Sequence, residues 1–210
     1  MKKIFLIFSI LFFSTNLVAD EIENFEIEGF TIGESLLKHF SKKDIETEVN
    51  SIWSYKYKDN KYIQLGVADK KDYSLKKKTN LFDSMSIVIK GDDKNYIIKS
   101  LSGKILCHNN INRCNLKYGE IVTDLKIYFE NSIDEVTDRK QTHSVDKKKE
   151  SWVTSTYFYL KNRKYANIMV EIYDWSKRVE KEQNWGDNLK LSIQTDEFIE
   201  FLQKEAYDKL

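Results

Sequence analysis

The chain has no proline, only two cysteines and only seven glycines in 210 residues. No glycine-rich loop joins a strand to a helix, which excludes the usual phosphate and dinucleotide cradles. Two cysteines cannot form a dense disulfide framework, so stability must come from a hydrophobic core. Basic residues are mostly lysine, and this bias, like the missing proline, indicates a low-GC genome rather than a structural demand.

The chain also has no large excess of positive or negative charge. The whole chain carries a formal net charge of +1, and without Lys2 and Lys3 the net charge is about −1. This balance gives no overall attraction to nucleic acid, so we expect no nucleic-acid partner. Hydrophobic residues make up 41% of the chain, which excludes a disordered or fibrous protein.

Residues 1–19 have the three parts of a secretory signal peptide. Lys2 and Lys3 are followed by an apolar run at 4–13 and by a polar stretch that ends at Ala19. The run is too short to span a bilayer of roughly 30 Å, and no later run reaches the ~20 apolar residues of a membrane helix. We therefore expect cleavage after Ala19, a periplasmic or secreted protein, and no membrane span in the mature chain. A retained anchor is the alternative.

The two cysteines, Cys107 and Cys114, are predicted to form a disulfide, because an oxidising compartment leaves exported cysteines paired. The alternative is a metal site that adds His108 to two thiolates. It would offer at most three ligands without the paired C-x-x-C spacing of zinc sites. The same spacing is not that of a thiol oxidoreductase. We expect no metal and no cofactor.

Residues 107–129 are predicted to contain the central helix, beginning just after an extended segment that ends at Cys107. Apolar residues recur there every three or four positions, which places them on one face of a helix. The inward face would consist of Ile111, Cys114, Tyr118, Ile121, Leu125 and Tyr128.

Alternation of apolar and polar residues predicts antiparallel hairpins within 53–67, 85–101 and 153–173, and one more strand at 189–193. Capping residues predict helices that begin at Ile32, after Thr31, and at Asp196, after Thr195. Ser41 with Asp44 is a second capping signal, after which Ile45 and Val49 continue an apolar stripe through a second turn or helix. Residues 131–150 are charged and without periodicity, which predicts a loop or linker. Antiparallel hairpins beside helices give an α+β fold.

We expect a single domain over residues 20–210. Its halves, 20–107 and 108–210, both read as helix, polar loop and hairpin, and this order suggests the hypothesis of two tandem repeats.

A resemblance rests on short stretches spread over most of the mature chain. These are Gly33-Glu34-Ser35-Leu36-Leu37, Tyr96-Ile97-Ile98 leading to Ser102-Gly103, Cys107, and Tyr173-Asp174-Trp175-Ser176 with Trp185. With them the sequence resembles a group of uncharacterised exported proteins from low-GC marine bacteria, and the resemblance implies no activity. The helix-plus-antiparallel-strand repeat is also similar in outline to periplasmic inhibitor and outer-membrane-assembly accessory folds.

Catalytic motifs are missing around the three histidines, His39, His108 and His143. None is accompanied by a nucleophile elbow, a zincin pair or a serine–lysine signature. Acidic residues are so numerous that pairs such as Asp92 and Asp93 arise without a catalytic role. No catalytic residue is assigned.

The candidate binding face is aromatic and lies on the hairpin within 153–173. If Ile168, Val170 and Ile172 face the core, alternation turns the neighbouring side chains away from it. These are Tyr157, Tyr159, Tyr165, Met169 and Tyr173. Such a face marks a partner or glycan site if it is open. The alternatives are a second layer that covers it, or ordinary cross-strand pairs. Trp175 and Trp185 either extend the face or cap the core.

The sequence therefore predicts a non-catalytic binding or protein-interaction module, with an unknown protein, peptide or glycan as its partner. The alternative is a periplasmic hydrolase of unfamiliar type that uses scattered carboxylates.

Overall fold

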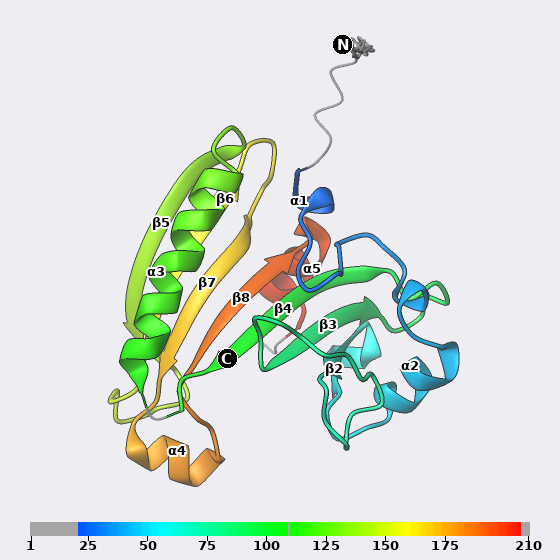
Figure 1. Cartoon of the computed structure of the whole chain (residues 1–210), viewed down its shortest axis with the longest axis horizontal. Helices are drawn as coiled ribbons and strands as arrows, with labels where there is room; N and C mark the ends of the chain where they lie inside the picture. The colour runs from blue at the N-terminus through cyan, green and yellow to red at the C-terminus, as the bar shows by residue number, and fades with distance from the viewer. Residues whose placement is uncertain (1–20, 109, 207–210) are drawn as a thin grey trace, which may run out of the picture.

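The computed structural model describes residues 21–108 and 110–206, so the expected signal peptide lies outside the described residues. The fold is α+β, as predicted: within these described residues, five α-helices accompany one eight-stranded antiparallel sheet. Figure 1 shows α3 (Ile111–Tyr128) in front of the sheet and α5 (Asp196–Lys204) behind it. The two faces of the sheet are therefore covered by different elements.

The sheet has the strand order β1-β2-β3-β4-β8-β7-β6-β5. Its strands are β1 (Tyr55–Lys56), β2 (Tyr62–Val67), β3 (Ser84–Lys90), β4 (Ile98–Leu106), β5 (Ile133–Thr142), β6 (Trp152–Leu160), β7 (Ala166–Asp174) and β8 (Asn188–Gln194). Residues 20–107 supply the first four strands and residues 108–210 the other four, and the two sets join where β4 pairs with β8. The predicted hairpins and the strand near 189–193 are confirmed.

Helix α3 begins at Ile111, where the side chain of Asn110 accepts the Arg113 N–H at 3.4 Å. Cys114, Ile121 and Leu125 are buried against the sheet, as predicted. The prediction was wrong for Tyr128, which is 52% exposed. The helix ends there, and the next residue, Phe129, turns into the core, with its ring 5.2 Å from that of Phe25.

The predicted disulfide is present between Cys107 and Cys114, with an S–S distance of 2.04 Å. Both cysteines are fully buried. The bond fixes the start of α3 to the end of β4. It also leaves no thiolate for the alternative metal site with His108.

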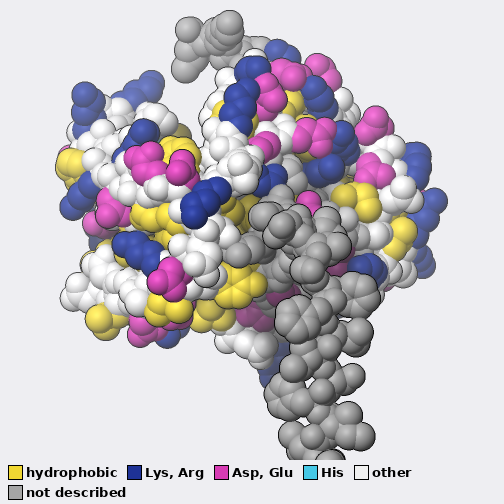
Figure 2. Space-filling model, turned by 90° about the horizontal axis from the view of Figure 1, so that it is seen from above, with side chains coloured by type: hydrophobic (Ala, Val, Ile, Leu, Met, Phe, Trp, Pro, Cys, Tyr) yellow, Lys and Arg dark blue, Asp and Glu magenta, His cyan; other side chains and the backbone are white. Residues whose placement is uncertain are grey.

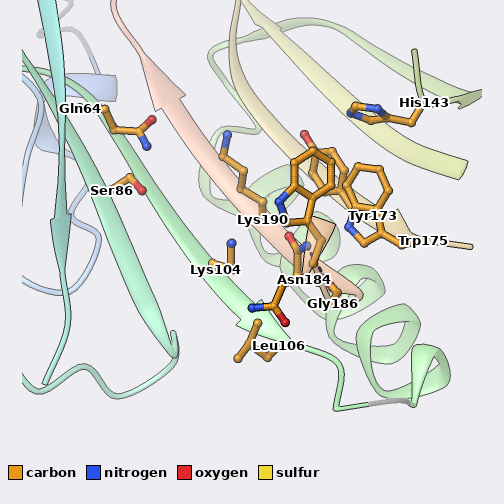
Figure 3. A pocket seen from close by; sticks show the side chains of 12 residues that line it. Gln64, Ser86, Lys104, Leu106, His143, Tyr173, Trp175, Asn184, Gly186 and Lys190 are labelled. Carbon is orange, nitrogen blue, oxygen red and sulfur yellow. Dashed lines mark hydrogen bonds between the residues drawn. The ribbon is translucent and has the colours of Figure 1, made fainter. Parts of the chain in front are cut away.

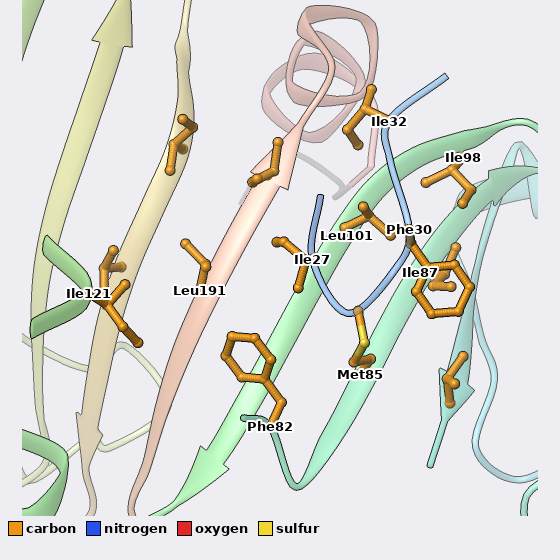
Figure 4. Packing of buried hydrophobic residues seen from close by; sticks show 14 of the residues in the cluster. Ile27, Phe30, Ile32, Phe82, Met85, Ile87, Ile98, Leu101, Ile121 and Leu191 are labelled. Atoms are coloured by element: carbon orange, nitrogen blue, oxygen red, sulfur yellow. The ribbon is translucent and has the colours of Figure 1, made fainter. Parts of the chain in front are cut away.

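The N-terminal segment covers the half of the front face that α3 leaves open. Figure 4 shows Ile27, Phe30 and Ile32 lying over β3 and β4, where they pack with buried strand residues such as Met85 and Leu101. This segment includes the short helix α1 (Glu21–Asn24). One apolar core therefore continues under α3 and under the N-terminal segment.

The predicted helix from Ile32 is wrong except for one 3₁₀ turn, η1 (Leu36–Lys38). Glu34 does accept the Thr31 N–H at 2.8 Å, as a capping box requires. However, the Ile98 N–H donates to the carbonyl of Glu34 at 2.9 Å, so β4 holds this backbone in an extended conformation. The first regular helix of this region is α2 (Lys42–Val49), which Ser41 caps.

The back face is covered at one end by α5. Thr195 caps the helix by accepting the Phe198 N–H, as predicted. Phe198 and Phe201 are buried on Tyr62 and Val88 of the sheet. Burial of two such rings stabilises the docked helix by roughly 1.5–3 kcal/mol for each ring. Helix α5 leaves the other end of the back face uncovered by a helix, among the described residues (Figure 1).

The predicted loop at 131–150 is wrong for its first half, which forms the edge strand β5. Among the described strands only β6 pairs with β5, so most side chains of β5 face water. Its many charged residues hid the alternation that marks a half-buried strand. Helix α4 (Lys177–Gln183), which Ser176 caps, was not predicted.

In the part of the chain that the structure describes, no helix combines the length and the apolar character that a bilayer crossing requires. Figure 2 shows Lys and Arg side chains interspersed with Asp and Glu over the surface seen from above. This agrees with the even charge balance of the sequence.

Candidate ligand-binding cleft

The back face of the sheet carries a cleft of about 420 Å³, which we call the back cleft. It crosses β2, β3, β4, β8 and the end of β7 (Figure 3). Its lining consists of Gln64, Ser86, Lys104, Leu106, His143, Tyr173, Trp175, Asn184, Trp185, Gly186, Asn188 and Lys190. The strand residues among them alternate with core residues, so the same alternation that builds the core aims these polar side chains into the cleft.

One side of the back cleft is an aromatic wall made of His143, Tyr173, Trp175 and Trp185. The Tyr173 and Trp175 rings are stacked, with centroids 5.6 Å apart. The centroids of Trp175 and Trp185 are 4.8 Å apart, and those of His143 and Trp175 are 4.6 Å apart. Trp185 keeps 41% of its surface exposed and presents an open ring face, whereas Trp175 is 7% exposed.

The wall is held by backbone contacts near the disulfide. Asp187 Oδ1 accepts the Trp175 N–H at 2.8 Å, and the carbonyl of Asp187 accepts the Cys107 N–H at 2.9 Å. The wall is thereby tied to the end of β4. The buried indole Nε1 of Trp175 has no hydrogen-bond partner among the described residues. Unpaired buried donors are uncommon and occur at functional sites.

Two lysines, Lys104 and Lys190, form a cross-strand pair where β4 meets β8, and we call them the lysine pair. Figure 3 places them between Gln64 and Ser86 on one side and Tyr173 and Trp175 on the other. Neither ammonium forms a salt bridge within the described residues. Burial lowers the pKa of Lys104, and the positive charges of Lys190 and Lys70 lower this pKa further. More than a third of Lys104 is nevertheless exposed, so an anion can reach it.

One carboxylate on the sheet, that of Glu171, is directly opposite Lys190 on β7. It accepts a hydrogen bond from the Tyr173 hydroxyl at 3.0 Å and one from Ser155 at 3.5 Å. Burial raises the pKa of Tyr173, and the negative charge of Glu171 raises it further, so the phenol stays protonated. Glu171 is thus engaged with the wall rather than with a lysine.

His143 is neutral at pH 7, because burial lowers its pKa although Glu171 and Asp146 oppose this effect. Its Nδ1 accepts the Val145 N–H at 3.2 Å. The neutral ring therefore carries its proton on Nε2, which is a hydrogen-bond donor.

The predicted binding face is only partly brought together. Ile168, Val170 and Ile172 do face the core under α3. Of the predicted tyrosines, Tyr173 lines the back cleft and Tyr157 is half-buried beside Arg139, 5.5 Å from its ring. Two others lie at the far end of the hairpin: Tyr159 is opposite Ala166, and Tyr165 precedes β7 beside Lys164. Met169 is opposite Tyr157.

Sequence reasoning missed the lysine pair and the amides of Gln64 and Asn188. Alternation places Lys104 and Lys190 on the non-core side of their strands. Alternation does not predict that β4 pairs with β8, and it is this pairing that brings the two lysines together. Trp175 and Trp185, which the sequence left either on the aromatic face or over the core, both line the cleft, and Trp175 is buried.

Compared with protein-family models, with curated proteins and with solved structures, the chain matches none. The resemblance to exported marine bacterial proteins stays a prediction.

Proposed function

We propose that the chain is an exported, non-catalytic binding protein whose site is the back cleft. Its ligand carries a ring with a flat apolar face, which stacks on the aromatic wall. The observation that carries this proposal is the exposed ring of Trp185, packed on Trp175 of the aromatic wall, beside the amides and the serine hydroxyl that line the cleft. Export is supported by the signal-peptide pattern of residues 1–19 and by the disulfide.

The chemistry of the lining fits ligand binding. Flat rings bury apolar area with little loss of conformational entropy, and a few polar groups orient the ligand. Gln64, Ser86, Asn184 and Asn188 offer such polar groups along the cleft. The wall is packed before a ligand arrives, so binding need not order it.

The hydrolase alternative receives no support from this cleft. Among the described lining residues none is Asp or Glu, and His143 has no nucleophile paired with it. Most glycoside hydrolases use a pair of carboxyl groups that flank the bond to be cleaved.

The test is a thermal-shift screen of the mature protein against neutral oligosaccharides, acidic oligosaccharides, aromatic carboxylic acids, peptides and lipids. A ligand at a hundred times its Kd stabilises the folded state by about 2.7 kcal/mol, which raises the melting temperature by roughly 5–10 °C. We expect a ring-bearing class to give this shift.

The variant Trp185→Ala then identifies the site. Its affinity for that class should fall at least tenfold, as measured by calorimetry, because the open ring face is gone. Trp152→Ala is the matched control, since Trp152 is 40% exposed but lies outside the cleft. Equal losses in both variants, or a melting temperature unmoved by every ring-bearing class at millimolar concentration, would overturn the proposal.

A further inference from the structure

A second aromatic pair flanks the back cleft at its opposite end. The rings of Trp53 and Tyr73 are stacked, with centroids 4.8 Å apart and planes at 10°. The pair lies over Gly66, where a Cβ atom would be 2.7 Å from the Tyr73 ring. Gly66 is directly opposite Ser86, which lines the cleft. Trp53 keeps 38% of its surface exposed.

This second pair is positioned by one buried carboxylate. Glu48 of α2 is fully buried and accepts hydrogen bonds from the Ser51 hydroxyl at 3.0 Å and from the Ser74 N–H at 2.9 Å. Ser51 precedes Trp53 by two residues, and Ser74 follows Tyr73. Glu48 therefore holds together the two loops that supply the rings.

The distance between the two aromatic sites fits an extended ligand. From β2 to β7 there are four inter-strand steps, because the order is β2-β3-β4-β8-β7. At a strand spacing of about 4.8 Å, these steps cover about 19 Å. The lysine pair lies between the two sites, on the middle strands β4 and β8.

The charged side chains that line the back cleft have one sign, and the nearby carboxylate of Glu171, opposite Lys190 on β7, is hydrogen-bonded to Tyr173 and Ser155. Lys104 and Lys190 have no salt-bridge partner among the described residues, and Lys70 is close enough to Lys104 to lower its pKa. No carboxylate belongs to the described lining. A cleft lined by charge of one sign attracts a ligand of the opposite sign.

The sheet itself argues against a peptide strand as this ligand. Peptides that bind sheets pair their backbone with a free strand edge. The back cleft crosses the middle of the sheet, where β3, β4, β8 and β7 are each already paired on both sides. Recognition must therefore come from side chains, and those present are flat rings, amides, a serine hydroxyl and ammonium groups.

We infer that the ligand is an acidic oligosaccharide that lies across the back cleft from Trp185 to Trp53, with its anionic groups at the lysine pair. This inference rests on the proposed function and specifies its ligand. Sugar rings stack on the two aromatic sites, the amides bind hydroxyl groups, and Lys104 and Lys190 bind carboxylate or sulfate groups. Lysine acts there as a point charge, without the fixed fork of arginine.

The test measures binding of a galacturonic acid tetrasaccharide, its neutral methyl ester, and a sulfated galactose tetrasaccharide by calorimetry at two salt concentrations. We expect the acidic sugars to bind at least tenfold more tightly than the methyl ester, with affinity that falls as salt rises. Comparison of the affinities for the two acidic sugars shows whether the lysine pair prefers carboxylate or sulfate groups. A tetraglutamate peptide is included and should bind more weakly than either acidic sugar.

Two sets of variants complete the test. The double variant Lys104→Gln/Lys190→Gln should lose at least tenfold in affinity for the acidic sugars, whereas Lys94→Gln/Lys126→Gln, which alters exposed lysines outside the cleft, should not. Trp53→Ala should lower the affinity for the acidic tetrasaccharide at least fivefold. It should leave the affinity for an acidic disaccharide bound at Trp185 unchanged, because only the longer chain reaches Trp53.

The possible failures are distinct. Equal affinity for the acid and its methyl ester, unchanged binding by the lysine variant, or tighter binding of tetraglutamate would overturn this inference. If Trp185→Ala still weakens binding in those cases, the proposed function stands. Binding of sugars that is insensitive to Trp185→Ala would overturn both.

Discussion

At the scale of single residues, two glycines on neighbouring elements have opposite roles. Gly103 on β4 faces the core, and a Cβ atom there would be 2.5 Å from atoms of the buried Phe82 ring. Gly119 on α3 is exposed, and a Cβ atom would meet nothing within 4 Å. The first glycine is required by close packing, whereas the second only weakens its helix.

We predict that Gly103→Ala lowers the free energy of unfolding by about 1–3 kcal/mol, because the ring must shift in a packed core. Gly119→Ala should raise the same free energy by about 0.5–1 kcal/mol. Urea denaturation of both variants measures the difference. A Gly103→Ala variant as stable as the natural chain would show that Phe82 is free to move.

The sequence predicts the position of some cleft residues but not of others. Alternation placed Ile168, Val170 and Ile172 in the core and Tyr173 on the other side, and the structure confirms this. It is a local property of one strand, so it can be read from sequence. The lysine pair depends on two strands whose lysines are far apart in the chain, and no local pattern encodes that contact.

At the scale of elements, Asp146 joins the loop after β5 to α4. Its side chain is fully buried and accepts hydrogen bonds from the hydroxyl and N–H of Ser151 at 2.7 and 2.8 Å, and from the Lys148 N–H at 3.0 Å. It also pairs with Arg178 of α4. His143 of the aromatic wall lies in this loop, so Asp146 stabilises one end of the cleft.

These contacts make one contribution to the pH dependence of stability. Burial alone would raise the pKa of Asp146, but Ser151, the Lys148 N–H and Arg178 outweigh burial and lower the pKa to about 2 from 3.8. The folded-state pKa is depressed, so this stabilisation is fully present above the unfolded pKa near 3.8. It is lost as the pH falls toward 2.

We predict that Asp146→Asn lowers the melting temperature at pH 7 by roughly 5–10 °C, because a charge-assisted network is lost. Between pH 5 and pH 2 the variant should lose less stability than the natural chain does. Asp174→Asn is the control, since Asp174 is exposed and forms no hydrogen bond or salt bridge among the described residues. Parallel pH profiles for the natural chain and Asp146→Asn would contradict the assignment.

The predicted elements were right where local signals and tertiary contacts agree. Helix α3 and the hairpin of β6 and β7 have strong hydrophobic periodicity, and their apolar faces lie in the core. The segment after Thr31 has a capping box, yet pairing with Ile98 outweighs its helix signal. Strand β5 has almost no apolar alternation, because it is an edge strand held by one neighbour.

At the scale of the whole molecule, the strand order could not be derived from sequence. The two halves of the chain each give four consecutive strands, but they meet through β4 and β8 rather than through β4 and β5. The back cleft crosses this junction, with Gln64 and Ser86 from one half and Tyr173 and Trp175 from the other. Neither half contains a complete cleft.

The junction of β4 and β8 should therefore be among the most protected parts of the protein. Both strands are paired on each side, and Leu101, Leu189 and Ile193 on them are buried in the core that α3 and the N-terminal segment share. Amide hydrogen exchange should be slowest in β4 and β8, where opening approaches global unfolding, and fastest in the edge strands β1 and β5. Exchange in β4 and β8 as fast as in β5 would show that the halves separate at the junction, which would make them two domains and the cleft a site between them. Slow exchange on both strands would show that the residues of the cleft are held on one cooperative sheet.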